Sequence, residues 1–299
     1  MSYTSDPLLP SHRPPPEPVA GDVEFVALGG GVGVGRRIRT EPGTAAAAWS
    51  AVDQHRLGPR VEGADRVAAM ADLLGQWQEH VRTVAMPDDP DSAANLNWPS
   101  RDVAMNRVFL ACGLAPLRSL AVRPSGPVAH TEPEPGTRVR PLTEADLDAA
   151  VALHVEQIRW DEQCGSGYLR PAAETVARQD YVEALGRSEP WTWVADVDGR
   201  VVGLITVTPP DPANWFGPLT AARSPAYVGT TVVAPDHRGG GVGAALVARA
   251  HAALHDAGAD VVLLHYSLLN PLSGPFWHRH GYRPLWTWWE TRPASALRG

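Results

Sequence analysis

The stretch APDHRGGGVGAALVARAHAAL, Ala234 to Leu254, places an arginine and three consecutive glycines directly before a run with helical periodicity. A helix N-terminus exposes unpaired backbone N–H groups and the positive end of the helix dipole, and glycines let an anion approach these groups closely. The stretch therefore predicts a phosphate-binding loop. The loop alone does not identify the ligand, and four interpretations have to be compared.

Two nucleotide interpretations fit the loop poorly. A nucleoside-triphosphate loop requires Gly-Lys-Ser/Thr, but residues 243–245 are Gly-Ala-Ala. A dinucleotide loop is satisfied by Gly239, Gly241 and Ala244, but it also needs an acidic residue at the far end of the next strand, and Asp260 lies at the wrong end, where that strand starts. A glycine turn without a ligand stays open, since glycine also serves tight turns.

The sequence around the loop predicts a mixed α/β domain over residues 137–299. Thr143 is expected to cap a first helix with acidic residues in its first turn, and Pro171 opens a second helix. Helices are expected at 143–158, 171–185, 240–257 and 271–280, and strands at 138–142, 191–197, 200–207, 226–233, 260–267 and 282–292. Their order combines an antiparallel meander with one strand–helix–strand crossover.

The N-terminal half predicts a weaker copy of the same pattern. Pro and Gly cluster at 124–136, which predicts a linker between a domain at 22–123 and the domain at 137–299; residues 1–21 are expected to be a disordered Pro-rich tail. Laying the two halves over each other without a gap pairs Gly113 with Gly281, Pro116 with Pro284, Leu117 with Leu285 and Asp102 with Asn270. We interpret this as a decayed internal repeat. A second glycine run, 29–37, has no amphipathic helix after it and predicts a hairpin.

The spacing of four features resembles a known family. Arg238 begins an R-x-x-G-x-G loop, a strand ends in Val-Val-Ala-Pro before it, and Asn270 is followed after ten residues by Gly281-Tyr282. This pattern is similar to that of the GNAT superfamily of N-acetyltransferases, over about half of the chain. The resemblance implies a GNAT-like fold in 137–299, with a partial, degenerate GNAT-like copy in the N-terminal half.

The resemblance implies acetyl-coenzyme A as the cofactor and direct transfer of its acetyl group to an amine. The pyrophosphate would lie on the N–H groups of the glycine loop, and the pantetheine arm would pair with the strand before it. The cofactor-binding residues expected on this basis are Val232, Val233, Arg238, Gly239, Gly240, Gly241, Val242, Gly243, Ala244 and Asn270.

The general acid departs from the family pattern. Many relatives carry a tyrosine four residues before the glycine of the GF pair, and this chain has Trp277 there, whose indole cannot donate a proton usefully. His265 and Tyr266, at the end of the strand that faces the crevice, are the expected catalytic replacements, with His278 and His280 as neighbouring options. Water-relayed proton transfer is a further possibility.

The acceptor pocket of such folds is walled by the loop between the first two helices and by the last strands. This nominates a set of acidic, amide and aromatic residues that suits a cationic or heteroaromatic amine. The expected substrate-binding residues are Gln157, Trp160, Asp161, Glu162, Tyr168, Tyr227 and Trp286, with Trp215 beside them. No metal ligand is expected.

Composition disfavours several other classes of protein. The 299 residues carry a net charge of -7 and are 44% apolar, which argues mildly against a nucleic-acid binder. Two cysteines do not support a disulfide framework, and no apolar run approaches the roughly 18 residues of a membrane span. We therefore expect a cytoplasmic acetyltransferase for a small-molecule amine, with homodimer formation left open. The alternatives are a tandem acyltransferase resembling mycothiol synthase and a non-catalytic acyl-coenzyme A sensor.

Overall fold

The computed structural model describes residues 6–10, 17–127, 133 and 135–298. Contacts divide the chain into two units: unit 1 comprises Met1–Pro42, Trp49–Ser119 and Pro284–Gly299, and unit 2 comprises Gly43–Ala48 and Leu120–Arg283. The boundary thus falls within one strand, β5 (Ala115–Pro124). The expected sequence division at 124–136 stays a prediction, and both that linker and the expected tail lie partly outside the described residues.

Unit 1 is built on a mixed sheet in which β1, β2, β3, β4 and β11 are neighbours in that order. All neighbouring pairs are antiparallel except β3 and β4, which run parallel and are joined by α1. The predicted glycine-rich hairpin is confirmed, because Gly29 and Gly30 both have φ near +101° in the turn between β1 and β2. The elements of unit 1 are β1 (Val23–Ala27), β2 (Gly31–Arg39), β3 (Asp53–Val61), α1 (Arg66–Val84), β4 (Ser92–Pro99), α2 (Asn106–Ala111) and β11 (Arg283–Thr291).

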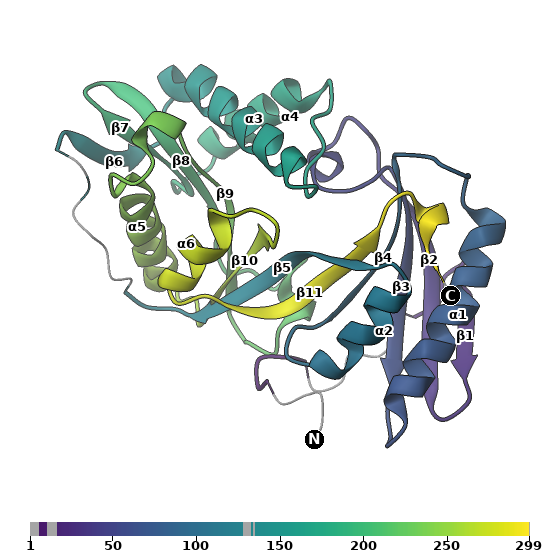
Figure 1. The fold of residues 1–299 in the computed structure, drawn as a ribbon. Coiled ribbons are helices and arrows are strands. Elements are labelled where there is room, and N and C mark those ends of the chain that lie inside the picture. The colour runs from purple at the N-terminus through teal and green to yellow at the C-terminus, as the bar shows by residue number, and fades with distance from the viewer. Residues whose placement is uncertain (1–5, 11–16, 128–132, 134, 299) are drawn as a thin grey trace. The chain divides into compact units, whose positions relative to one another are not determined.

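Unit 2 contains the predicted meander and crossover. Its strands are neighbours in the order β10, β9, β8, β7, β6, with only β9 and β10 parallel (Figure 1). The predicted helices and strands are present, with ends that differ by a few residues. They are β6 (Thr137–Pro141), α3 (Leu147–Gln163), α4 (Ala173–Leu185), β7 (Thr192–Val197), β8 (Arg200–Thr208), β9 (Pro225–Val233), α5 (Val242–Asp256), β10 (Val261–Ser267) and α6 (Ser273–Arg279).

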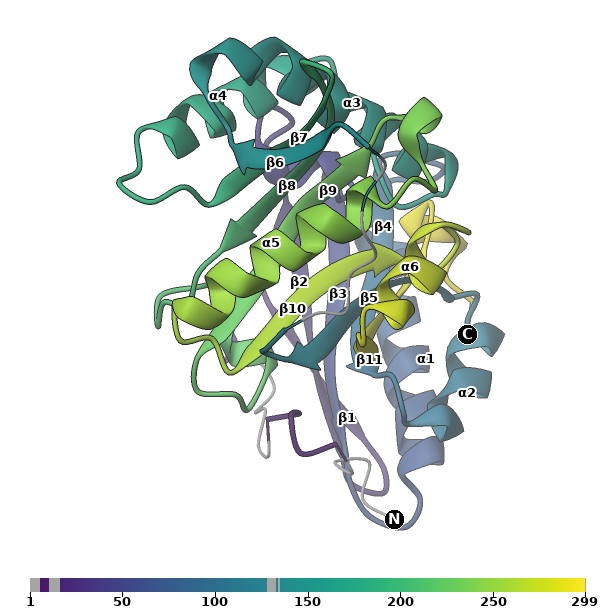
Figure 2. The same ribbon diagram turned by 90° about the vertical axis from the view of Figure 1, so that its left-hand side faces the viewer.

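The glycine-loop helix α5 lies across one face of the unit 2 strands (Figure 2). Its apolar side chains Val242 and Leu246 are fully buried in the core of that face. Gly203 of β8 makes the close approach possible, because a Cβ there would come within 2.9 Å of Leu246 and 3.2 Å of Val242. The apolar stripe of α5 and this missing side chain together fix the helix, and with it the glycine loop, against the sheet.

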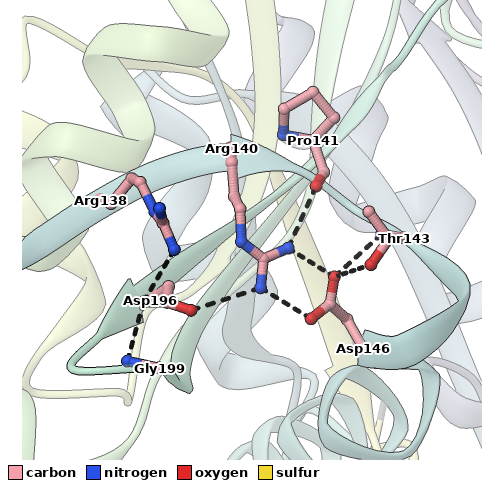
Figure 3. A network of polar contacts seen from close by, with 7 residues as sticks. All are labelled: Arg138, Arg140, Pro141, Thr143, Asp146, Asp196 and Gly199. Carbon is pink, nitrogen blue, oxygen red and sulfur yellow. Dashed lines mark hydrogen bonds and ion pairs between the residues drawn. The ribbon is translucent and has the colours of Figure 1, made fainter.

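A partly buried ionic network anchors the start of α3 to the sheet (Figure 3). Arg140 of β6 donates to both carboxylate oxygens of Asp146, at 2.6 and 2.8 Å, and lies 3.4 Å from Asp196 of β7. Asp146 also accepts the Thr143 N–H at 2.9 Å, which is one bond of the capping box that Thr143, the predicted cap, forms with Asp146 at the helix start. Hydrogen bonding to Arg140 lowers the pKa of Asp146 to about 2. The network places α3, whose later turns carry the candidate acceptor residues.

The internal repeat is visible in the secondary structure of both halves. β4, α2 and β5 recur as β10, α6 and β11, with the predicted partners Gly113 and Gly281 at φ +77° and +84°. The residue after each glycine donates to the carbonyl five residues earlier, Leu114 to Phe109 and Tyr282 to Trp277, at 3.0 and 3.1 Å. A left-handed glycine therefore ends the short helix in the same way in both copies. No helix in the described part of the chain is long and apolar enough to cross a membrane.

A fully buried histidine lies in the core of unit 2. His251 of α5 is 2.9 Å from the hydroxyl of Tyr282, through Nε2, and 3.5 Å from Arg123, through Nδ1. Because a guanidinium can only donate, Nδ1 accepts and Nε2–H donates to Tyr282. Burial, with a further contribution from the positive charge of Arg123, lowers the pKa of His251 to about 3.

Because of His251, we expect the free energy of unfolding to decrease in acid. Protons bind His251 more readily in the unfolded chain, near its ordinary pKa of 6.5, so the free energy of unfolding falls as the pH drops below that value. We expect its contribution to be about 2 kcal/mol smaller at pH 4.5 than at pH 7. Urea unfolding at both pH values should show a smaller pH-dependent loss in His251→Gln, while His255→Gln, an exposed position on the same helix, keeps the wild-type loss. An equal pH-dependent loss of unfolding free energy in wild type and His251→Gln would contradict the attribution of this loss to His251.

Candidate functional site

The glycine loop has the backbone geometry of an open helix N-terminus. Gly239 and Gly241 have φ of +89° and +84°, values that side-chain-bearing residues rarely adopt. Gly241 is the N-cap of α5, and its carbonyl accepts the Ala245 N–H at 3.0 Å. Among the described residues, no atom lies within 4 Å of the Cβ position of Gly239, so the loop faces open space. The N–H groups of the first helical turn are therefore available to an anion.

The strands that flank the loop diverge. The parallel register of β9 and β10 runs from Pro225↔Val261 to Val228↔Leu264, and both strands continue beyond it, to Val233 and Ser267. The two strands therefore separate beyond Val228 and Leu264. Backbone groups of β9 that would otherwise pair with β10 face the gap, where an extended ligand can pair with them.

A bulge in β9 changes which face its side chains occupy. Ile205 and Val207 of β8 pair with Thr231 and Val228, so two steps on β8 match three on β9. Val228 packs in the core with the α5 residues, whereas the Thr230 hydroxyl lies 3.4 Å from Nε2 of His154 on α3. The bulge therefore places Thr230 on the face opposite that of Val228, and no feature of the sequence indicates its position.

A cavity of about 920 Å³ occupies the gap, and all of its lining residues belong to unit 2. Every expected cofactor-binding residue lines it except Val242, which is buried in the core under β8. Gly243 lets α5 approach α6, because a Cβ there would come within 3.3 Å of the Phe276 ring. The structure thus brings the expected cofactor residues together, and their contact with a cofactor stays a prediction.

His265, the first expected catalytic residue, lines the cavity within an aromatic cluster. Its Nδ1 is 2.8 Å from the hydroxyl of Tyr227, and its ring is stacked with that of Trp215 at 5.9 Å and 14°. Tyr227 also stacks on Phe216 at 5.4 Å. If Nδ1–H donates to the Tyr227 oxygen, Nε2 keeps a lone pair that can accept a proton.

Tyr266, the second expected catalytic residue, lines the cavity from the opposite face of β10. Successive side chains of a strand point to opposite faces, and Tyr266 joins the α5 core while His265 joins the aromatic cluster. The Tyr266 side chain is largely buried, and its hydroxyl is 3.0 Å from Nε2 of His278 on α6. His278 is exposed, so the phenol is connected to the protein surface through an imidazole.

Trp277 fills the place of the missing family tyrosine. Its indole lines the cavity and packs edge-on against Tyr282 at 5.3 Å and Phe276 at 4.9 Å. Tyr266 approaches the same short helix, since its ring lies 3.6 Å from the Cβ position of Gly274. Tyr266 is therefore the phenol that the cavity offers beside α6.

Helix α3 supplies the other side of the cavity. Gln157, Trp160 and Asp161 line it, and Asp161 accepts a hydrogen bond from the Asn270 amide at 3.1 Å. The carbonyl oxygen of that amide accepts the N–H groups of Leu272 and Ser273 at the start of α6. Helix α3 also contacts the glycine loop, because the Arg238 guanidinium lies over the Trp160 ring at 5.2 Å. Asn270 therefore acts in the structure as a brace between α3 and α6.

The remaining expected acceptor residues lie elsewhere in the structure. Glu162 accepts the Leu169 N–H at 2.8 Å, and Tyr168 donates its own N–H to the Ala48 carbonyl at 2.9 Å. Neither of them, nor Tyr227, is among the described residues that line the cavity, although Tyr227 contacts His265. Trp286 belongs to β11 in unit 1 and does not line the cavity.

Sequence reasoning missed a set of small polar residues in the cavity wall. Within the described residues, buried side-chain oxygens without a hydrogen-bond partner occur at Gln157, Thr231, Ser267 and Ser273, and all four residues line the cavity. Only Gln157 was expected. The other three residues stand out only by their position, at the diverging ends of β9 and β10 and at the start of α6. This position could not be predicted, because no sequence pattern indicates where the two strands diverge.

In unit 1, side chains occupy the position that corresponds to the glycine loop of unit 2. At the start of α1, Arg66 makes a two-pronged ion pair with Asp102, the repeat partner of Asn270. Asp102 also accepts the Trp98 indole N–H at 3.0 Å, and the carboxylate is almost fully buried. The helix that corresponds to α5 therefore begins at an internal carboxylate rather than at a glycine cradle.

Residues 154–282 match the model of the Acetyltransferase (GNAT) family. The fold is similar to a GCN5-related N-acetyltransferase from Kribbella flavida, at 16% identity over 90% of this chain and 88% of that one, with a TM-score of 0.50. A GCN5-related N-acetyltransferase from Sphaerobacter thermophilus is similar at 14% identity over 88% and 80% of the two chains, with a TM-score of 0.54. No curated protein matches the sequence. The expected GNAT-like fold is confirmed, and the likeness extends from residues 154–282 into unit 1.

Proposed function

We propose that this chain, whose residues 154–282 form a GNAT acetyltransferase domain, transfers an acetyl group from acetyl-coenzyme A to the primary amine of a small molecule. The observation that carries the proposal is the cavity between the diverging ends of β9 and β10, with the glycine loop in its wall. An acidic chain without a basic excess suits a small amine better than a nucleic acid. A small-molecule acceptor and a cytoplasmic location belong to the same proposal.

The cavity residues fit coenzyme A. Gly239 and Gly241 hold left-handed backbone geometry that exposes N–H groups to a diphosphate, and the open β9 edge offers partners to an extended amide-containing arm. When bound, the cofactor supplies an activated thioester: the C–S bond breaks, a C–N bond forms, the amine loses a proton and the thiolate gains one. An N–H group of the β9 edge, near Val232 and Val233, would polarise the thioester carbonyl.

His265 is positioned to accept the amine proton. It lines the cavity together with Gln157 and Asp161, and its Nδ1 lies 2.8 Å from the Tyr227 hydroxyl, a contact that holds the ring in place. A primary amine arrives mostly protonated at neutral pH, and it must lose a proton before attack. A general base within reach of the amine nitrogen serves this step.

Tyr266 is positioned to protonate the departing thiolate. Its hydroxyl lies on the face of β10 that contains α5 and α6, and the exposed His278 can return a proton from solvent through the 3.0 Å contact. The two neighbouring residues of β10 thus serve the two proton transfers from opposite faces of one strand. Trp277 leaves the family position without an acid, and Tyr266 takes over that role.

Thiol release from acetyl-coenzyme A tests the proposal. The purified full chain should release free coenzyme A only when a primary amine is added, and no release with any member of a broad amine panel would contradict it. The chain contains no lysine, so acetylation of its own lysine side chains gives no background. Calorimetric binding of coenzyme A without turnover would instead support the acyl-coenzyme A sensor, which Trp277 favours.

A further inference from the structure

The cavity wall contains more unpartnered polar atoms than a ligand-free interior would keep. Gln157 Oε1, Thr231 Oγ1, Ser267 Oγ and Ser273 Oγ are all buried without a hydrogen-bond partner in the described part of the chain. Each buried, unsatisfied polar atom costs about 1–3 kcal/mol, and native interiors hold few of them. Ser267 is 6% exposed as a whole residue, so its hydroxyl is not simply solvated. Their convergence on one cavity indicates that a ligand completes their hydrogen bonds.

The four atoms separate onto two faces of the sheet. Thr231 and Val233 are two residues apart on β9, and Val233 meets α5 at Gly243, so Thr231 lies on the α5 side, where Ser273 begins α6. Ser267 and His265 are likewise two residues apart on β10, so they share the opposite face of the sheet. Helix α3 packs on that face, since its His154 contacts Thr230 of β9. Gln157, which belongs to α3, therefore lies on the same side as Ser267 and His265. The first pair lies on the side of the glycine loop, and Gln157 and Ser267 lie on the side of His265.

An exposed aromatic side chain, Trp215, contacts His265 of the cavity wall, although Trp215 itself is not among the lining residues. The Trp215 side chain is 61% exposed, although it contacts three aromatic rings: His265 at 5.9 Å, Phe216 at 5.5 Å and Tyr227 at 5.4 Å. Phe216 beneath it is fully buried, which fixes the cluster. A rigid, exposed indole beside the candidate base is a surface on which a flat ring can stack.

From this juxtaposition, and resting on the proposed function, we infer that the acceptor is a primary amine attached to a flat aromatic ring. The ring stacks on Trp215, and the nitrogen donates to Gln157 Oε1 and bonds to Ser267 Oγ beside His265. Gln157 accepts only through this oxygen, so it selects an N–H or O–H donor. Asp161 in the same wall adds a negative charge that favours a cationic amine over a neutral alcohol.

A matched pair of amines tests the ring. 2-Phenylethylamine and 2-cyclohexylethylamine have the same carbon skeleton and the same charge but differ in aromaticity. With coenzyme A-saturated protein, calorimetry should give about tenfold tighter binding of the phenyl compound, and Trp215→Ala should remove this preference. Trp215 is exposed, so the variant keeps its folded core, which the melting temperature checks. Equal affinity for the two amines, or an unchanged preference in Trp215→Ala, overturns the inference.

Two further variants separate ligand recognition from structure. Gln157→Leu and Ser267→Ala remove an unpartnered buried oxygen, so each should keep or raise the melting temperature while weakening 2-phenylethylamine binding about tenfold. A purely structural residue would lower the melting temperature instead, and that result contradicts the assignment. Thr137→Val is the matched control: Thr137 also has a buried side-chain oxygen without a hydrogen-bond partner among the described residues, but it does not line the cavity, so amine affinity should be unchanged.

The binding and turnover readouts distinguish this inference from the proposed function. Trp215-dependent binding of 2-phenylethylamine without acetylation upholds the aromatic site and overturns the acetyltransferase. Acetylation of both amines at equal rates, independent of Trp215, upholds the acetyltransferase and overturns the aromatic site.

Discussion

Gly241→Glu is expected to weaken coenzyme A binding by more than about 100-fold, which corresponds to roughly 2.7 kcal/mol. Gly241 is the N-cap of α5 at φ +84°, where any side chain is strained. Glutamate also places bulk and negative charge at the N–H groups that would receive the diphosphate. Calorimetric titration of coenzyme A into the wild type and the variant measures the loss.

The control for this variant lies at the other end of the same helix. Gly258 has φ +81°, with no atom of the described residues within 4 Å of its Cβ position, and it does not line the cavity. Gly258→Glu therefore introduces the same charge and a similar backbone strain far from the loop, and it should keep wild-type affinity. Equal affinity in Gly241→Glu and wild type would overturn the assignment of the loop.

Tyr266→Phe is expected to lower kcat by about 100-fold or more, within the range that a general acid contributes. The change removes only the hydroxyl that contacts His278, so coenzyme A affinity should hold. His278→Ala should have a smaller effect, because water can replace the imidazole at its exposed position. Initial rates against an amine that the panel identifies, with saturating acetyl-coenzyme A, measure both.

A second tyrosine–histidine pair of unit 2 provides the matched control. Tyr282 and His251 are 2.9 Å apart, as closely paired as Tyr266 and His278, but neither lines the cavity. Tyr282→Phe should therefore lower the melting temperature and leave kcat nearly unchanged. A kcat for Tyr266→Phe within threefold of wild type would rule out the phenol as the acid and favour a water relay.

The fold was largely predictable because its signals are local. The glycines before α5, the Asp-Gly turn after Val197 and the apolar periodicity of α3 each specify one element within a short window. The repeat could also be found, since Gly113 and Gly281 must both end a helix in left-handed geometry. The membership of β11 in unit 1 could not be predicted, because its pairing with β4, far away in the sequence, is not indicated by the residues of β11 themselves.

The site was predictable only where backbone geometry demanded a residue type. Glycine is required at φ +84°, so Gly241 could be assigned from its motif. Thr231, Ser267 and Ser273 could not, because their importance comes from the bulge and from the divergence of β9 and β10. Tyr168 and Trp286 were expected by analogy of position, and the described residues place both outside the cavity wall. Small polar residues become informative only when burial and missing partners are known.

We propose acetyl transfer to an amine in the cavity between β9 and β10. Incubating the full chain with carbon-13-labelled acetyl-coenzyme A and a primary amine panel that includes 2-phenylethylamine, followed by mass spectrometry, measures this transfer most directly. We expect an amide product that carries one labelled acetyl group, formed by the wild type and lost in Gly241→Glu. Labelled acetyl-coenzyme A that stays intact with every amine, or equal product from Gly241→Glu, would contradict it.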